Sequence, residues 1–362
     1  MLRVLRAAAP SRTAATAHWN PQLIKRYHSS DKQDTAIYHS ISTNPWFNLA
    51  YEDWIFRKTP ASQIVLFIYR NSPSVIIGRN QNPWREINLR LLRQLDIPFV
   101  RRRSGGGTVY HDLGNSNYCV FMPRQQFERR TNALLVSDAL NNLDINTYVN
   151  DRNDICSAFK LVNARAYHHG TMLIDAKLKD LKGVLSNEKA SSMTSKGVES
   201  VPSPVRNLRE WDPYLDHQSF FDAVADQFIH VYGGRKEVHL VDESELKIND
   251  YVKNSYEELQ SWDWQWGQTP EFTIQVKGNF SWGQPTFNIT AHHGIVTDTS
   301  FSTTTEAKLS QEQTKACDKI CQVLTGEKYE DVSAIEKLAA DCRAPEERRI
   351  YADVAACLKD GM

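Results

Sequence analysis

The chain contains the stretch Arg101-Arg102-Arg103-Ser104-Gly105-Gly106-Gly107-Thr108-Val109-Tyr110-His111-Asp112. Three consecutive glycines cost conformational entropy, and their usual benefit is that backbone N–H groups approach a ligand closely. The arginines beside them offer positive charge and paired donors for a carboxylate or phosphate. The stretch therefore predicts a loop that binds a nucleotide or an acyl phosphate, although a flexible hairpin turn beside a solvated basic face would also explain it. Because no Gly-Lys-Ser/Thr follows at the required spacing, it is not a Walker loop.

The segments around this loop alternate irregularly between apolar runs and helical periodicity. Residues 64–69 and 74–78 have the composition of buried strands, and the turn Asn71-Ser72-Pro73 between them suggests a hairpin. Further strands are expected at residues 98–100, 117–121 and 168–174, and helices at 48–55, 87–95, 132–143 and 220–231. This order predicts a mixed α/β or α+β sheet with flanking helices, not a doubly wound parallel sheet.

Two later stretches differ in composition from the residues before them. Residues 186–204 are rich in Ser, Lys and Gly, which is typical of a mobile loop or of a segment that orders on a ligand. After residue 249 we expect antiparallel strands at 272–276, 286–290 and 294–297 and a helix at 310–324. The predicted organisation is a catalytic domain over 36–255 and a small α+β accessory domain over 256–362.

Composition excludes several classes of protein. The chain has 362 residues, 43 Lys and Arg against 43 Asp and Glu, and no apolar run near the length of a membrane span. A net charge of zero argues against a protein held on nucleic acid by bulk phosphate attraction. Six cysteines in so long a chain do not form a disulfide framework, and no metal-binding spacing is evident, so we predict no metal site built by the protein.

The N-terminal residues 1–30 contain Arg3, Arg6, Arg12, Lys25 and Arg26 and no acidic residue. Ala, Ser and Thr fill the positions between them. This composition is typical of a mitochondrial transit peptide, and an uninformative tail is the alternative. We therefore expect a mitochondrial matrix protein.

The string from Arg101 to Asn117, Arg-Arg-x-Ser-Gly-Gly-Gly-x-Val-x-His-Asp-x-Gly-Asn-x-Asn, resembles the signature of the lipoate–protein ligase A and lipoyltransferase family. Other segments are similar to the family's motifs over residues 36–285: 48–52, 73–82, 167–171, 196–208 and 264–272. The resemblance implies a biotin/lipoate ligase-like fold. A biotin ligase shares that fold, but its Gly-Arg-Gly-type loop is absent from this sequence.

The resemblance also implies a reaction in two steps. Lipoate attacks the α-phosphate of ATP with Mg²⁺ to give lipoyl-AMP, and a lysine of an acceptor then takes the lipoyl group. The acceptors implied are lipoyl domains of 2-oxo acid dehydrogenase complexes and the glycine-cleavage carrier protein. The nucleotide-binding residues implied are Arg79, Arg102, Ser104, Gly105, Gly106, Gly107, Thr108, Val109, Tyr110, His111 and Asp154. Val75, Ile76 and Val109 would line the tunnel for the lipoyl chain, and His169 would also contact substrate, although a core histidine is the alternative for it.

The sequence departs from the family where an essential lysine is expected in Lys-x-Ser-Gly-Ser/Thr-Ala. Here Asp154-Ile155-Cys156 runs directly into Ser157-Ala158-Phe159-Lys160, so part of that motif is missing. One alignment places the lysine in the gap, and a second places Lys160 on it. Losing one such donor costs about 10²–10³ in rate. A variant or mispredicted product, a substituting Lys160, a binding-only protein, or Cys156 as an acyl-accepting thiol would each explain the departure.

Three functions therefore stay open. The first is an ATP-dependent ligase, with Lys160 as the candidate catalytic residue. The second is a lipoyl or octanoyl transferase that does not activate its substrate with ATP. The third is a non-catalytic protein that binds lipoyl-AMP or the acceptor.

Overall fold

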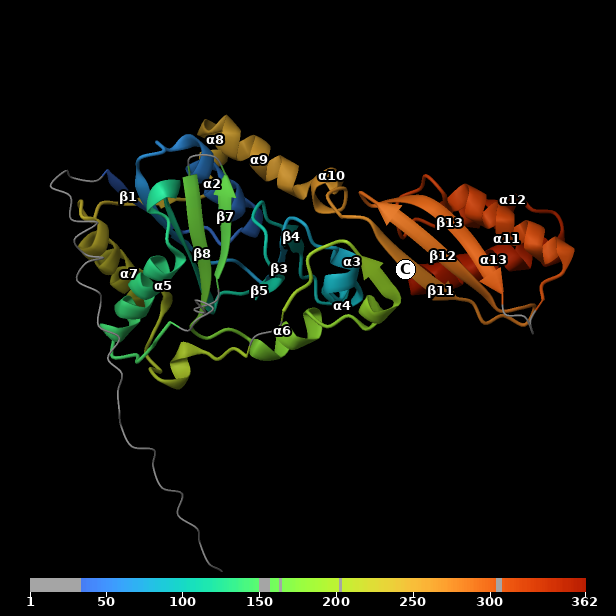
Figure 1. Ribbon diagram of the computed structural model, residues 1–362, viewed down its shortest axis with the longest axis horizontal. Helices are drawn as coiled ribbons and strands as arrows, with labels where there is room; N and C mark the ends of the chain where they lie inside the picture. Colours follow the sequence, from blue (N-terminus) through green and yellow to red (C-terminus); the bar gives the residue numbers. More distant parts are fainter. Residues whose placement is uncertain (1–33, 150–156, 163–164, 202–203, 304–307) are drawn as a thin grey trace, which may run out of the picture.

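The computed structural model describes residues 34–149, 157–162, 165–201, 204–303 and 308–362. The molecule is elongated, with a larger part built from the first two thirds of the chain and a smaller C-terminal part beside it (Figure 1). The expected transit peptide, residues 1–30, lies outside the described residues. Among the residues described, no helix is both long and apolar enough to cross a bilayer.

The larger part is organised around a six-stranded sheet of order β10-β1-β2-β6-β8-β7. Strand β1 pairs in parallel with β2 and β10, whereas the pairs β2–β6, β6–β8 and β7–β8 are antiparallel. The sheet is therefore mixed, as predicted. Its strands are β1 (Thr35–Ser40), β2 (Ile64–Tyr69), β6 (Asn115–Pro123), β7 (Ser157–Val162), β8 (Arg165–Leu173) and β10 (Val238–Val241).

Helices cover both faces of this sheet. Alternate residues of β2 point to opposite faces, so Val65 and Phe67 pack with α2 (Pro45–Lys58) and α9 (Asp250–Gln260). On the other face, Leu66 and Ile68 pack with α5 (Arg129–Asn141) and α7 (His217–Tyr232). Burial on both faces explains why β2 is an uninterrupted apolar run. Short helices η1 (Arg124–Gln126), η3 (Leu208–Glu210) and α8 (Glu245–Ile248) join these elements.

A separate three-stranded sheet of order β4-β3-β5 carries the glycine loop. It consists of β3 (Ser74–Ile77), β4 (Phe99–Arg101) and β5 (Val109–His111), and the loop joins β4 to β5. The expected hairpin of residues 64–78 is wrong, because β2 already pairs with β1 and β6 while β3 pairs with β4 and β5. The turn moves the chain from one sheet to the other.

The expected helix at 87–95 forms in shortened form, over residues 89–94. Ile87 takes an extended conformation that ends α3 (Pro83–Glu86), and the Asn88 side chain caps the N-terminus of α4 (Leu89–Gln94). Asn82 caps α3 in the same way, with Pro83 at its first position. The sequence signals for two helix starts, Asn82 and Asn88, are thus only six residues apart.

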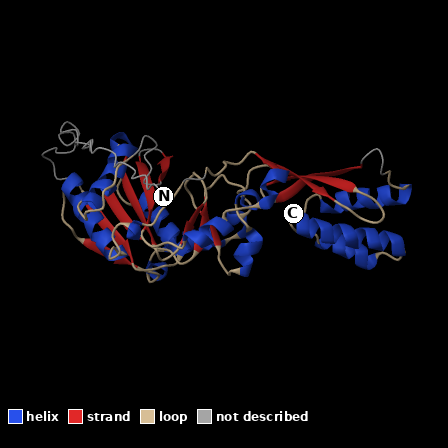
Figure 2. Ribbon diagram, turned by 90° about the horizontal axis from the view of Figure 1, so that it is seen from below, coloured by secondary structure: helices blue, strands red, loops and turns tan. Residues whose placement is uncertain are grey.

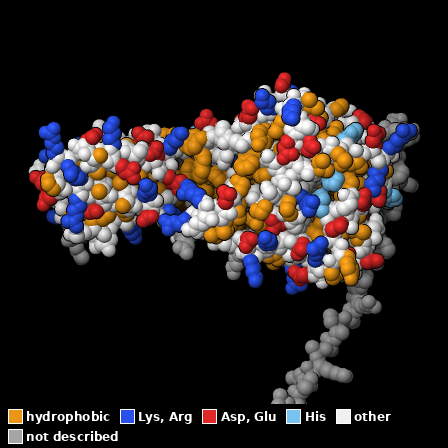
Figure 3. All heavy atoms as spheres, turned by 180° about the vertical axis from the view of Figure 1, so that it is seen from behind, with side chains coloured by type: hydrophobic (Ala, Val, Ile, Leu, Met, Phe, Trp, Pro, Cys, Tyr) orange, Lys and Arg blue, Asp and Glu red, His pale blue; other side chains and the backbone are white. Residues whose placement is uncertain are grey.

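The C-terminal part is a four-stranded antiparallel sheet of order β13-β12-β11-β9 with helices on one face (Figure 2). Its strands are β9 (Met193–Ser195), β11 (Phe272–Lys277), β12 (Pro285–His292) and β13 (Ile295–Thr303). Its helices are α11 (Gln311–Leu324), α12 (Ser333–Asp341) and α13 (Pro345–Gly361). On the face seen in Figure 3, acidic and basic side chains are interspersed over this part, in keeping with the zero net charge.

Two segments connect the parts. Strand β9 comes from the stretch expected to be mobile or ligand-ordered, and it pairs with β11 of the C-terminal sheet. It follows α6 (Leu178–Val184) and η2 (Glu188–Ser192). Helix α9 runs across the expected boundary at residue 255 and packs on α2, and α10 (Trp262–Gln265) leads into the C-terminal strands. The C-terminal sheet therefore includes residues from the middle of the chain.

Candidate functional site

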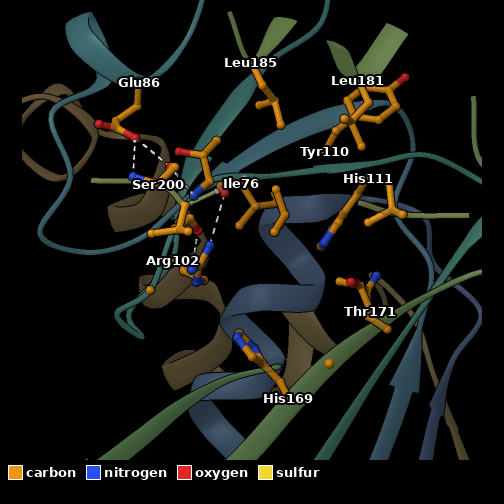
Figure 4. A pocket seen from close by; sticks show the side chains of 18 of the residues that line it. Ile76, Glu86, Arg102, Tyr110, His111, His169, Thr171, Leu181, Leu185 and Ser200 are labelled. Carbon is orange, nitrogen blue, oxygen red and sulfur yellow. Dashed lines mark hydrogen bonds between the residues drawn. The ribbon is translucent and has the colours of Figure 1, made fainter. Parts of the chain in front are cut away.

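A pocket of about 840 Å³ lies where β3, β5, β8 and α6 meet. Figure 4 shows Glu86, Ser200 and Arg102 on one side of it, Leu181 and Leu185 above, and His169 at the other end. Many of its lining residues come from the glycine loop and the strand that follows. The lining includes Ile76, Arg102, Gly106, Gly107, Thr108, Val109, Tyr110, His111 and His169 from the predicted set.

The glycine loop packs tightly against the end of β3. A Cβ placed on Gly78 would lie 2.0 Å from the carbonyl oxygen of Gly106, so no larger residue fits there. Gly106 itself has φ 91°, which side chains disfavour. The Arg79 N–H donates to the carbonyl of Ser104 at 2.9 Å and ties the two turns together. Glycine is thus needed for conformation and for close packing.

Arg102 shapes the loop from within. Its side chain is buried and donates to the carbonyl oxygens of Ile76, Gly105 and Gly107 at 2.7–3.2 Å. Burial lowers the pKa of Arg102 to about 10, so the guanidinium stays charged at neutral pH. Arg102 also lines the pocket. To make the predicted phosphate contact, its guanidinium would have to bind the ligand while it keeps its hydrogen bonds to the loop.

The neighbouring arginines connect the loop to α9 and α10. Arg101 is fully buried and donates to the carbonyl of Gln265 and to Thr269, while Trp264 Nε1 donates to the Arg101 carbonyl at 2.7 Å. Arg103 pairs with Asp53 at 3.2 Å and lies over the Trp264 ring. The alternative of a solvated basic face is therefore wrong, because these side chains hold the linker to the C-terminal part.

A polar network fixes the loop to the segment after β9. Glu86 Oε2 accepts hydrogen bonds from the Ser200 hydroxyl at 2.6 Å and the Ser200 N–H at 2.9 Å. Ser200 Oγ accepts from the Thr108 N–H, and Gln81 bridges Gly78 N–H, Thr108 and Ser200. Glu86, Ser200 and Gln81 were not among the predicted site residues. The Asn-Pro helix start at Asn82 marks this region in the sequence, but nothing local indicates its partner more than 100 residues away.

Apolar side chains line the pocket away from the loop. They are Leu49, Ile76, Val109, Leu173, Leu178, Leu181, Leu185, Val201 and Val205. Val75, predicted beside Ile76, points to the opposite face of β3 and packs with Ile87, Leu92 and Phe99. The period of two along a strand separates these neighbours.

The end of the pocket at His169 borders a buried carboxylate. Glu52 of α2 accepts hydrogen bonds from the Tyr69 hydroxyl at 3.0 Å, the Tyr167 hydroxyl at 2.8 Å and the Cys119 thiol at 3.1 Å. His169 Nδ1 lies 3.7 Å from Glu52 Oε2. Burial raises the pKa of Glu52, but His169, Cys119 and Tyr167 together lower it to about 2, so the carboxylate is ionised at neutral pH.

His111 lines the pocket and carries a single, buried N–H donor. Asn48 Nδ2 donates to the carbonyl of Arg70 and to Asn71 Oδ1, so Asn71 Nδ2 is left to donate to His111 Nδ1 at 3.0 Å. The His111 proton is therefore on Nε2, which has no hydrogen-bond partner among the described residues. Burial and the nearby Arg102 lower the pKa of His111 to about 3, so the ring is neutral.

The remaining predicted residues either do not line the pocket or are not among the residues that the structure describes. Arg79 is exposed, 5.6 Å from the Trp264 ring, while Ser104 and Gly105 belong to the loop without lining the pocket. Lys160 is in β7, with its backbone opposite Tyr167. Asp154 and Cys156 fall outside the described residues. The roles assigned to these residues stay predictions.

Comparison with known proteins identifies this architecture. Residues 44–229 match the profile of the lipoyl protein ligase A/B catalytic domain. The chain is 37% identical over 260 residues to lipoate-protein ligase A of Psychrobacter cryohalolentis, covering 68% of this chain and 76% of that protein.

Two solved structures share the fold. The structure of P. falciparum LipL1 in complex with lipoate has a TM-score of 0.57 and 23% identity, and covers 90% of this chain and 99% of that one. The structure of lipoate-protein ligase A bound with ATP has a TM-score of 0.54 and 21% identity, and covers 64% of this chain and 98% of that one. The fold and site are those of an enzyme of the ligase or lipoyltransferase type. The chain belongs to the lipoyl protein ligase A/B family, which confirms the predicted resemblance and fold class.

Proposed function

We propose that this protein is an ATP-dependent lipoate–protein ligase that forms lipoyl-AMP and transfers the lipoyl group to a lysine of an acceptor domain. The observation that carries the proposal is a single pocket with two chemically different halves. One half is a glycine loop beside a buried arginine, and the other is lined by leucine, isoleucine and valine. A mixed anhydride of a nucleotide and an apolar acyl chain has the same two halves.

In the first step, a carboxylate oxygen of lipoate attacks the α-phosphorus of ATP, and the bond to pyrophosphate breaks. The electron pair leaves with the pyrophosphate. The chain's part in this step is positioning and charge stabilisation, because no protein group needs to form a bond. Arg102 holds the loop and adds a fixed positive charge, and the His111 Nε2–H is a neutral, buried donor of a residue that lines the pocket.

In the second step, the neutral amine of an acceptor lysine attacks the acyl carbon of lipoyl-AMP. The C–O bond to AMP breaks, an amide forms, and the amine loses a proton. Exclusion of water protects the anhydride from hydrolysis during this time. Leu178, Leu181 and Leu185 of the α6 region cover the pocket and supply this apolar screen.

Mg²⁺ would neutralise the phosphate oxygens in the first step. Of the described residues, Glu86 and Glu199 are the carboxylates that line the pocket, and both are engaged, with Ser200 and with Arg85 respectively. Mg²⁺ usually keeps several waters and takes only one or two carboxylates together with substrate phosphates. Asp154 is predicted beside the nucleotide, and the triphosphate and water would hold most of the ion.

The proposed acceptors are lipoyl domains of 2-oxo acid dehydrogenase complexes and the glycine-cleavage carrier protein. These are the acceptors that the family resemblance implies. The proposed compartment is the mitochondrial matrix, and it is supported by the basic, acid-free composition of residues 1–30.

The test is the intact mass of an apo lipoyl domain after incubation with the full chain. One reaction contains lipoate, ATP and Mg²⁺, and a second contains preformed lipoyl-AMP. A lipoyl mass gain in both supports the ligase. A gain with lipoyl-AMP alone makes the protein a transferase and assigns the loss to the shortened Lys-x-Ser-Gly segment. No gain in either reaction overturns both enzyme functions.

A further inference from the structure

A carboxylate, a thiol and an imidazole lie close together in the larger part of the molecule, on Glu52, Cys119 and His169. They come from α2, β6 and β8, and their ligand atoms all lie within 4.8 Å of one another. Glu52 and Cys119 are buried, and His169 is partly buried. The proposed lipoylation chemistry uses neither the thiol nor the carboxylate.

Two of the three separations between these atoms are close to those around a zinc ion, and the third is within 4.8 Å. Zinc binds sulfur at about 2.3 Å and nitrogen or oxygen at about 2.0–2.2 Å. In a tetrahedral site those bond lengths place neighbouring ligand atoms about 3.3–3.7 Å apart. Cys119 Sγ is 3.1 Å from Glu52 Oε2, and His169 Nδ1 is 3.7 Å from the same oxygen. Small side-chain rotations would therefore complete a three-ligand site.

Charge also favours a cation at this point. Glu52 is a buried carboxylate, and among the described residues its one ion-pair contact is His169. The buried guanidinium of Arg102 supplies part of the counter-charge, since the charge of Glu52 acts to raise the pKa of Arg102. The hydrogen bonds of Glu52 come from neutral hydroxyl and thiol groups, which supply no charge. A divalent cation would place positive charge directly on the carboxylate.

An ion can reach the cluster through the pocket. His169 and Tyr69 line the pocket, so the cavity ends next to the ligand atoms. The hydroxyl oxygen of Tyr69 or Tyr167, both already bonded to Glu52, or a pocket water would serve as fourth ligand. Loading would release the thiol proton of Cys119, because the thiolate is the form that binds metal.

We propose that Glu52, Cys119 and His169 form a Zn²⁺ site at the His169 end of the pocket, and that Zn²⁺ there competes with the acyl chain. Soft sulfur and imidazole donors select Zn²⁺ over Mg²⁺, so the ion required by ATP does not occupy this site. Zn²⁺ binding at these residues does not depend on the proposed function. Inhibition by Zn²⁺ does rest on the proposed function, because competition requires the acyl chain to extend toward His169.

The first experiment measures binding without relying on activity. The full chain is titrated with Co²⁺ as a spectroscopic substitute for Zn²⁺, and thiolate-to-cobalt charge-transfer absorbance is recorded. Zn²⁺ affinity is then measured by displacing Co²⁺. We expect one equivalent bound, and C119S should weaken binding at least about 100-fold because a primary ligand is lost. Serine keeps a hydroxyl that can donate to Glu52, so the fold should be retained, as circular dichroism would show.

Two matched cysteine variants serve as controls. C342S changes a partly buried cysteine of the C-terminal part, and C156S changes the cysteine that precedes β7 in the sequence. Both should retain the cobalt spectrum and the Zn²⁺ affinity. A spectrum that survives in C119S, or that disappears in C156S, would overturn the proposed site. If C119S does not fold, H169Q is used, and an unchanged cobalt spectrum in that variant would overturn it equally.

The second experiment measures inhibition of lipoylation. Zn²⁺ should raise the apparent KM for lipoate without lowering the maximal rate, and C119S should be active and resistant to Zn²⁺. Zinc binding at Cys119 with no effect on the KM for lipoate would overturn the competition. An enzyme inactive toward every acceptor would fail the proposed function, while the cobalt titration would still decide whether the metal site exists.

Discussion

All six residues of β2 in the larger part are buried, whereas buried and exposed residues alternate strictly along β11 in the C-terminal part. The two parts also differ in what they bury. Among the described residues, no buried polar or charged side chain follows Thr269, while the larger part buries Arg101, Arg102 and Glu52. Burying a polar or charged group costs free energy unless it is hydrogen-bonded or paired. Such groups therefore indicate that the larger part holds the functional site. Substitutions should therefore affect activity in the larger part and stability in the C-terminal part.

The largest expected effect is on catalysis, in the variant Gly78→Ala. Its Cβ would lie 2.0 Å from the Gly106 carbonyl oxygen, so the glycine loop must move. A displacement of about 1 Å at reacting groups costs about 100-fold in rate. We expect at least that loss in lipoyl transfer, measured by the mass gain of the acceptor domain. Gly326→Ala is the control: Gly326 lies in the C-terminal part with open space around it, and its φ of 97° makes the substitution cost stability without moving the glycine loop. Equal activity losses in both variants would contradict the role given to the loop.

The next effect is on stability, in the C-terminal part. Phe287 is fully buried in the core of that part, and replacing a buried phenylalanine with alanine costs about 3–5 kcal/mol. Urea unfolding should show this loss for Phe287→Ala, while transfer activity measured well below the transition is retained. Gln275→Ala, on the exposed side of β11, should change stability by less than about 0.5 kcal/mol. A variant Phe287→Ala that stays stable but loses activity would break the comparison.

A smaller effect is expected for Glu86→Gln. The amide oxygen can still accept from Ser200, but the charge-assisted part of those hydrogen bonds is lost, at a cost of about 1–2 kcal/mol. The loop should then bind nucleotide about tenfold more weakly, seen as a raised KM for ATP in pyrophosphate release. Ser200→Ala should behave alike. Glu210→Gln, which removes an exposed pair with Arg206, is the control. An unchanged KM in Glu86→Gln would show that the network does not position the loop.

The smallest effect at neutral pH is that of His168 on stability, and it grows as the pH falls. Burial, above all, lowers the pKa of His168 from 6.5 to about 3. Between these values the unfolded chain binds a proton that the folded chain does not, so stability falls as pH decreases from 6.5 toward 3. Removing this group in His168→Phe should lessen the fall by up to about 1.4 kcal/mol per pH unit, measured by urea unfolding at several pH values. An equal change in the exposed variant His292→Phe would contradict this explanation.

The sequence predicted most of the individual elements well. The strand at 64–69 and the helices near 132–143, 220–231 and 310–324 all form with ends shifted by a few residues at most. These elements depend on local periodicity and on caps such as Ser310, whose capping box is present. The predicted hairpin of 64–78 was wrong because a strand can pair with strands that are distant in the sequence. A local pattern does not show which strands these are.

The site was predicted in part. Most of the residues named from the glycine motif line the pocket, because a motif of consecutive residues stays together in space. Gln81, Glu86 and Ser200 were missed as a group because Gln81 and Ser200 are 119 residues apart in sequence. The prediction that Val75 lines the tunnel beside Ile76 was wrong, because successive side chains of β3 point to opposite faces.

By itself, the sequence determined the elements, the glycine loop and the family, since each of these is written in contiguous residues. The tertiary structure alone decided that Arg101 and Arg102 are buried, that β9 joins the C-terminal sheet, and that Glu52 meets Tyr167 across 115 positions of chain. The physical reason is that burial and hydrogen bonding are satisfied between distant segments. Only the folded chain shows which charged groups are removed from water and which partners they find there.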